Sequence, residues 1–87
     1  MKYTVVYRPS AQNRLAELWT EGPDRQAITR AADEIDRRLG NDPQLQGESR
    51  TETTRIVFVE PLAILFEVSE ADRMVYVLKI WRVGRRS

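Results

Sequence analysis

The sequence predicts an α+β domain in which a mainly antiparallel sheet packs against a helical hairpin, in the order β-α-α-β-β-β. Two apolar stripes at helical spacing follow one alternating segment near the N-terminus. Three short segments rich in Val, Ile and aromatic residues come after them. With 87 residues the chain has the length of one domain, so residues 1–87 are expected to fold as a single unit.

The N-terminal segment predicts a strand followed by a helix. In residues 2–8, Tyr and Val at odd positions alternate with mostly polar residues, and this β-branched and aromatic content favours a strand. Pro9 ends the strand, and Ser10 is expected to cap the helix that follows. The apolar stripe of this helix comprises Ala11, Leu15, Leu18 and Trp19.

A second helix is expected after a break at Gly22-Pro23. Its apolar stripe runs from Ala27 to Leu39, and Gly40 is expected to cap its C-terminus. Helices joined by about four residues pack as an antiparallel hairpin. Residues 41–54 are polar and predict a long loop, and loops of this length are usually functional or mobile.

Three strands are predicted after the loop, at Arg55–Val59, Ala63–Val68 and Met74–Trp81, with short gaps that suit hairpins. The last strand is apolar on both faces, which is typical of a central strand. Regular alternation places Met74, Tyr76, Leu78 and Ile80 on one face, and Val75, Val77 and Trp81 on the other.

The composition excludes several classes of enzyme. The chain contains no Cys and no His, so it has no thiolate nucleophile, no Ser-His-Asp triad and no Cys- or His-based metal site. No phosphate-binding loop, dinucleotide fingerprint or calcium-binding loop is present either, and we expect no cofactor. The sequence shows neither a signal peptide nor a long apolar run, which predicts a cytoplasmic protein.

Two groups of carboxylates are candidates for a catalytic or metal site. Asp33, Glu34 and Asp36 are interleaved with arginines on the polar face of the second helix, a pattern that favours surface ion pairs over metal binding. A pair drawn from Glu60, Glu67 and Glu70 would suit glycoside hydrolysis, but their spacing singles out no pair.

The positive charge is concentrated at the C-terminus, although the net charge is only +1. Residues 79–87 contain four basic residues and no acidic one. This pattern indicates a localised anionic partner, and the alternative is a solvated end that keeps the protein soluble. The candidate phosphate-binding residues are Arg50, Arg55, Lys79, Arg82, Arg85 and Arg86. Trp81 is either a base-stacking ring in this positive surface or simply an apolar contact.

The whole chain resembles the RelE/ParE superfamily of toxins from bacterial type II toxin–antitoxin modules. The resemblance rests on the strand followed by Pro9-Ser10-Ala11, on Asp42-Pro43 and Gly47 after the second helix, and on the basic ending of residues 75–86. It implies an antitoxin partner that folds over the toxin. It also implies one of two activities, which are cleavage of mRNA on the ribosome and poisoning of DNA gyrase.

The ribonuclease activity implies cationic catalytic residues, and Arg55, Arg85 and Arg86 match the family's positions on the first strand after the helices and in the C-terminal stretch. Lys79, Trp81, Arg82 and Arg50 are then expected to bind the substrate. The chain departs from the pattern where Ala63 stands at a position that is arginine in family ribonucleases, and it has no tyrosine after Arg86. Tyr7 or Tyr76 would replace that tyrosine only if one of them faced the groove in which the RNA would bind. Gyrase inhibition, a non-toxic binding module of the same fold and an unrelated α+β domain are the alternatives.

Overall fold

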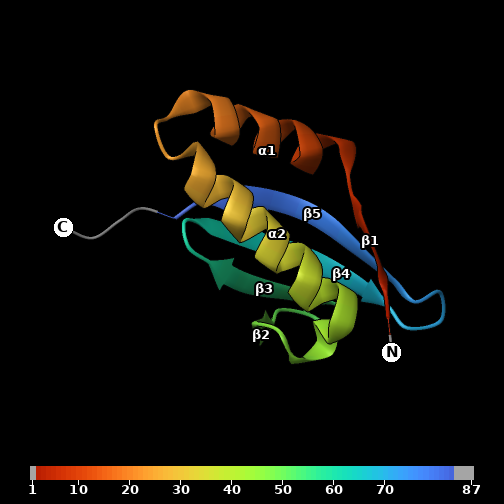
Figure 1. The fold of residues 1–87 in the computed structure, drawn as a ribbon. Helices are drawn as coiled ribbons and strands as arrows, with labels where there is room; N and C mark the ends of the chain where they lie inside the picture. Colours follow the sequence, from red (N-terminus) through yellow and green to blue (C-terminus); the bar gives the residue numbers. More distant parts are fainter. Residues whose placement is uncertain (1, 84–87) are drawn as a thin grey trace.

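Two helices lie over one face of a five-stranded sheet, as Figure 1 shows for the computed structural model, which describes residues 2–83. The α+β class predicted from the sequence is confirmed. The elements are β1 (Thr4–Tyr7), α1 (Pro9–Glu21), α2 (Arg25–Asn41), the short 3₁₀ helix η1 (Pro43–Leu45), β2 (Glu48–Ser49), β3 (Thr54–Val59), β4 (Leu62–Ser69) and β5 (Met74–Arg82).

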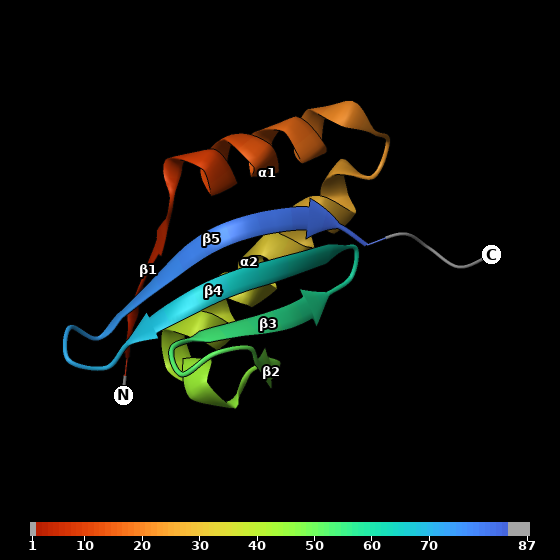
Figure 2. The ribbon, with the colours of Figure 1, turned by 180° about the vertical axis from the view of Figure 1, so that it is seen from behind.

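The strands are ordered β1-β5-β4-β3-β2 across the sheet, and Figure 2 shows the face that the helices leave uncovered. β5 is an interior strand between β1 and β4, as its apolar composition predicted. The pairs β5–β4, β4–β3 and β3–β2 are antiparallel, whereas β1 runs parallel to β5. The sheet is therefore mixed, because the helical hairpin returns the chain to the same end of the sheet before β3 begins.

The core lies between the helices and the covered face of the sheet. Leu62, Ile64 and Phe66 of β4 are fully buried there. Ile35 and Leu39 of α2 pack into the same cluster. Full burial of one such side chain contributes roughly 1.5–3 kcal/mol to folding, so this cluster is the main source of stability.

Both helices extend beyond the ends expected from capping residues. α1 begins at Pro9, so Ser10 lies inside the helix and no side chain caps its N-terminus. Proline is favoured at the first helical position because its missing N–H has no partner there in any case. α2 continues through Gly40 to Asn41, and the backbone N–H of Asp42 donates to the carbonyl of Arg38.

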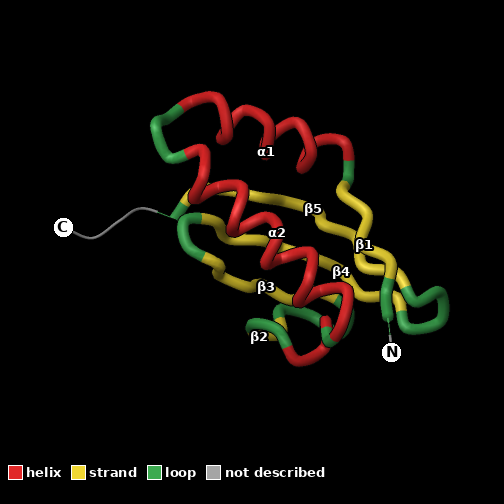
Figure 3. Tube along the Cα trace, in the orientation of Figure 1, coloured by secondary structure: helices red, strands yellow, loops and turns green. Residues whose placement is uncertain are grey.

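The segment between α2 and β3 is more ordered than the loop predicted for residues 41–54, because it contains η1 and β2 (Figure 3). Gly47 holds this segment close to β3. Its φ is +65°, and a Cβ built on it would lie 1.9 Å from the carbonyl oxygen of Ile56. Only glycine fits this backbone conformation and this close approach.

A β-bulge in β5 changes which residues face the core. Leu65 and Phe66 of β4 pair with Lys79 and Val77, so Leu78 is the extra residue of β5. The predicted alternation of the last strand is therefore wrong beyond Val77. Ile80 joins Val75 and Val77 on the helix-covered face, and Lys79 and Trp81 lie on the other face with Tyr76, because one added residue reverses the pleat.

Candidate functional site on the open face of the sheet

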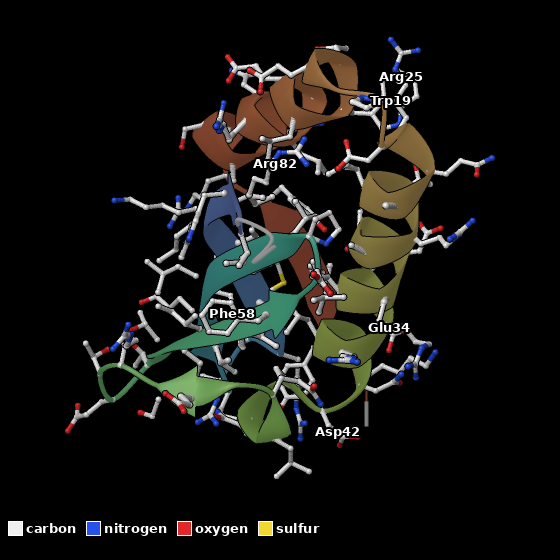
Figure 4. All side chains as sticks on the ribbon, turned by 90° about the vertical axis from the view of Figure 1, so that its left-hand side faces the viewer. Trp19, Arg25, Glu34, Asp42, Phe58 and Arg82 are labelled. Atoms are coloured by element: carbon white, nitrogen blue, oxygen red, sulfur yellow. The ribbon has the colours of Figure 1, made fainter. Side chains whose placement is uncertain are left out.

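Two aromatic side chains flank a small residue on the open face. Ala63 of β4 pairs with Phe58 of β3 on one side and with Trp81 of β5 on the other. Phe58 is 61% exposed and Trp81 is 36% exposed, whereas Ala63 is completely buried. Figure 4 shows Phe58 on the sheet and well away from Glu34 of α2. The two rings form an aromatic platform with the Ala63 methyl group between them.

Polar and charged side chains follow the aromatic platform along the same face. Lys79 pairs with Leu65, and the next open-face pair on these two strands is Tyr76 with Glu67. The guanidinium carbon of Arg8, just after β1, lies 5.1 Å from the centre of the Tyr76 ring. Within residues 2–83, neither Arg8 nor Lys79 forms an ion pair. Both cations are accordingly available to an anionic ligand.

Arg55 points to the helix-covered side and does not share a face with Lys79. It pairs with the core residue Phe66, and its side chain donates to two backbone carbonyls. The Nε–O distance to Gln46 is 2.8 Å, and the Nη2–O distance to Gly47 is 2.9 Å. The Arg55 guanidinium therefore holds the segment between η1 and β2 against β3.

Arg82 lies at the end of β5, between the sheet and the turn that joins the helices (Figure 4). Its guanidinium binds both carboxylate oxygens of Asp24, and about one third of each side chain is exposed. The hydrogen bonds from Arg82 lower the pKa of Asp24, and Asp24 in turn raises the pKa of Arg82. This pairing compensates the positive charge of Arg82 within the chain.

The other predicted cations are dispersed. Arg50 is exposed after β2, where its backbone N–H donates to the carbonyl of Thr54. Arg85 and Arg86 lie outside the described residues. In residues 2–83 the structure therefore brings only Lys79 and Trp81 together among the predicted site residues.

The two candidate tyrosines face opposite sides of the sheet. The Tyr7 hydroxyl lies on the helix side and donates to Asp36 Oδ1 at 2.7 Å. Burial and this hydrogen bond raise the pKa of Tyr7, so its phenol holds its proton tightly. Tyr76 lies on the open face with Lys79. Of the two candidate tyrosines, Tyr76 is therefore the one that shares a face with a predicted cationic residue.

Of the three carboxylates of α2 for which the sequence predicted surface ion pairs, only Glu34 forms them within residues 2–83. Glu34 binds Arg37 and Arg38, which lower its pKa, and Asp36 accepts the Tyr7 hydroxyl. No group of three potential ligands in residues 2–83 is arranged to hold a metal ion. No helix in that part of the chain is long and apolar enough to cross a membrane.

Sequence reasoning missed Phe58 and Arg8. Alternation along β3 identifies Phe58, since its neighbours Val57 and Val59 point to the core and Phe58 must then point away. The same rule applied to β1 places Arg8 on the open face with Val6. The contact of Arg8 with Tyr76 could not be found in this way, because it depends on the parallel pairing of β1 with β5.

The fold closely matches those of known toxins, although no protein-family model and no curated protein matches the sequence. The RelBE2 toxin–antitoxin complex of Mycobacterium tuberculosis is 17% identical, with a TM-score of 0.79 over 98% of this chain and 95% of that one. The isolated RelE toxin of E. coli is 10% identical, with a TM-score of 0.72 over 98% and 88%. The chromosomal ParDE system of P. aeruginosa is 18% identical, with a TM-score of 0.68 over 95% and 98%.

The matched fold has the order β-α-α-β-β-β-β, which adds the short strand β2 to the order predicted from the sequence. Because each match covers nearly the whole chain, the agreement concerns the complete fold rather than one motif. The chain has the fold of the RelE/ParE toxins.

Proposed function

We propose that this chain is the toxin of a type II toxin–antitoxin module and that it acts on translation by cleaving mRNA on the ribosome. The observation that carries the proposal is the open face of the sheet, where Phe58 and Trp81 flank Ala63 and Lys79 lies one pair further along. Unpaired bases stack on aromatic rings with a gain of about 1–3 kcal/mol per base, and a neighbouring lysine binds the phosphate.

An antitoxin partner is supported by a second surface. An apolar groove runs between α1 and α2 and continues toward β1. It is lined by Leu15, Ala16, Trp19, Ile28, Ala32 and Val5, among others. Trp19 is 42% exposed in the chain alone, and an amphipathic segment of an antitoxin would bury it. Several solved structures of this fold are themselves toxin–antitoxin complexes.

Gyrase inhibition is the second candidate, and a specific observation favours it. Arg55 donates to backbone carbonyls and Arg82 is paired with Asp24, so these predicted phosphate ligands already have partners. An open face with Phe58 and Trp81 exposed also suits the docking of a protein target, which needs no catalytic group.

The experiment that tests the proposal is a binding measurement on the purified chain. Fluorescence anisotropy with labelled single-stranded RNA should show binding that weakens at least tenfold in the Phe58→Ala and Trp81→Ala variants. Leu45→Ala is the matched control, since Leu45 is exposed in η1 away from the open face. Equal affinity in all variants would exclude the aromatic platform as the RNA site, and binding to gyrase instead of RNA would favour the second candidate.

A further inference from the structure

Tyr76 and Glu67 form a phenol–carboxylate pair on the open face. They occupy directly opposite positions of the antiparallel strands β5 and β4, where Cβ atoms lie about 4.5–5.5 Å apart. Glu67 accepts a long hydrogen bond of 3.4 Å from the Thr53 hydroxyl, and the Tyr76 hydroxyl has no hydrogen-bond partner within residues 2–83. A proton donor and a proton acceptor therefore project side by side from one surface.

Two cations border this pair. The Arg8 guanidinium carbon lies 5.1 Å from the centre of the Tyr76 ring, within the range of a cation–π contact. Lys79 follows Tyr76 on the same face of β5, after the bulge at Leu78. Positive charge beside an acid–base pair suits a substrate that carries a phosphate and develops negative charge during reaction.

We infer that Tyr76 and Glu67 are the proton-transfer residues of RNA cleavage, an inference that rests on the proposed ribonuclease function. The Glu67 carboxylate takes the proton of the ribose 2′-hydroxyl, and the 2′-oxygen forms a bond to phosphorus. The bond from phosphorus to the 5′-oxygen then breaks, and Tyr76 gives its phenolic proton to that oxygen. The products are a 2′,3′-cyclic phosphate and a 5′-hydroxyl end. Glu67 then loses its proton to water and Tyr76 regains one from water, so both side chains return to their starting states.

The location of the pair fits the aromatic platform. Phe58 and Trp81 lie at one end of the open face, Lys79 follows, and Tyr76 and Glu67 come next. RNA whose base stacks on the platform would then pass its backbone over Lys79 toward the proton-transfer pair. Tyr7 has no such role, because its hydroxyl is bonded to Asp36 beneath the helices.

The test compares Tyr76→Phe and Glu67→Gln with the wild-type chain in a ribosome-dependent cleavage assay. Tyr76→Phe keeps the ring that Arg8 stacks on and removes only the hydroxyl. Each variant should lose about 10²- to 10⁴-fold in cleavage rate, whereas co-sedimentation with ribosomes should be unchanged. Tyr3→Phe is the matched control, since the Tyr3 hydroxyl donates to Glu70 away from this pair and its loss should leave the rate at the wild-type level.

Three results separate failure of this inference from failure of the proposed function. A folded wild-type chain that leaves mRNA intact on the ribosome would overturn both. Wild-type cleavage with full activity in Tyr76→Phe would overturn the inference alone, and so would 5′-phosphate rather than 5′-hydroxyl ends. A thermal melt of each variant, matching that of the wild type, ensures that a lost rate reports chemistry and not unfolding.

Discussion

Arg82 and Asp24 form a bidentate ion pair that joins the end of the sheet to the turn between the helices. The Nη1–Oδ2 distance is 2.5 Å and the Nη2–Oδ1 distance is 3.3 Å, although the residues are 58 positions apart in the sequence. A guanidinium bound in this way is fixed in orientation. The pair accordingly sets the position of β5 where the chain leaves the sheet toward its basic C-terminus.

Removing this ion pair should reduce stability in a pH-dependent manner. Arg82 holds the pKa of Asp24 below the unfolded-chain value of about 3.9, so the folded protein binds this proton more weakly than the unfolded chain does. The contribution is complete above about pH 5 and is lost as the pH falls through the folded-state pKa. Thermal melts should show a lower Tm for Asp24→Asn than for the wild type at pH 7, and the difference should shrink steadily as the pH is lowered below about 4. A constant difference across this range would contradict the assignment.

Two glycine substitutions should have opposite effects. Gly47→Ala forces a methyl group into the backbone of Ile56 at a positive φ, and it should prevent folding or lower stability by several kcal/mol. Gly40→Ala lies within α2 with its nearest neighbour at 3.7 Å, so it should stabilise by about 0.5–1 kcal/mol. Urea unfolding measures both changes. Similar effects of the two substitutions would show that residues 46–49 do not pack on β3 as described.

Two leucine substitutions test the position of the core. Leu39 of α2 is fully buried in the core, and Leu39→Ala should cost about 2–5 kcal/mol through lost contacts and the cavity that remains. Leu45 is 77% exposed, and Leu45→Ala should change stability by no more than about 0.5 kcal/mol. Equal losses in chemical denaturation would place Leu45 in the core and contradict the packing of η1.

Arg55 should act on local structure. Replacing it with Gln removes its hydrogen bonds to Gln46 and Gly47, which should cost about 1–3 kcal/mol and speed amide exchange in residues 46–49. Hydrogen exchange followed by mass spectrometry measures this change. An unchanged exchange pattern together with lost RNA cleavage would instead support the catalytic role predicted for Arg55 from the sequence.

The proposed toxin function predicts that the groove between the helices controls neutralisation by an antitoxin. Trp19→Glu introduces a charge where the apolar surface is exposed, so toxicity should persist while co-expression of the antitoxin no longer restores growth. Growth curves with and without antitoxin measure both effects. Full rescue of the variant would place the antitoxin elsewhere.

The sequence was sufficient to predict both helices, the longer strands and most of the core, but not the two-residue strand β2, which lies in the segment predicted as a loop. The stripe ending at Leu39 and the apolar run of β4 both point inward as expected. These features depend on local periodicity, which is visible along the chain. The parallel pairing of β1 with β5 depends on contacts between residues about 70 positions apart, and local pattern does not report it.

The candidate site was harder to predict because it depends on partners that lie far away in the sequence. The order of apolar and polar residues in β5 does not reveal the bulge at Leu78. The bulge nevertheless places Lys79 and Ile80 on the opposite faces of the sheet from those that regular alternation predicts. Likewise, the charge of Arg82 looks available in the sequence until Asp24 is seen beside it. Residue type predicted which side chains can bind phosphate, and tertiary structure decided which of them are free.

Mapping of mRNA 5′ ends minutes after inducing the wild-type chain in a bacterial host without antitoxin tests the central claim most directly. Our account predicts growth arrest with new 5′ ends in register with codons, and their loss when Phe58 and Trp81 are both replaced by Ala. Growth arrest with intact mRNA, DNA breaks and an SOS response would contradict it and assign the chain to gyrase.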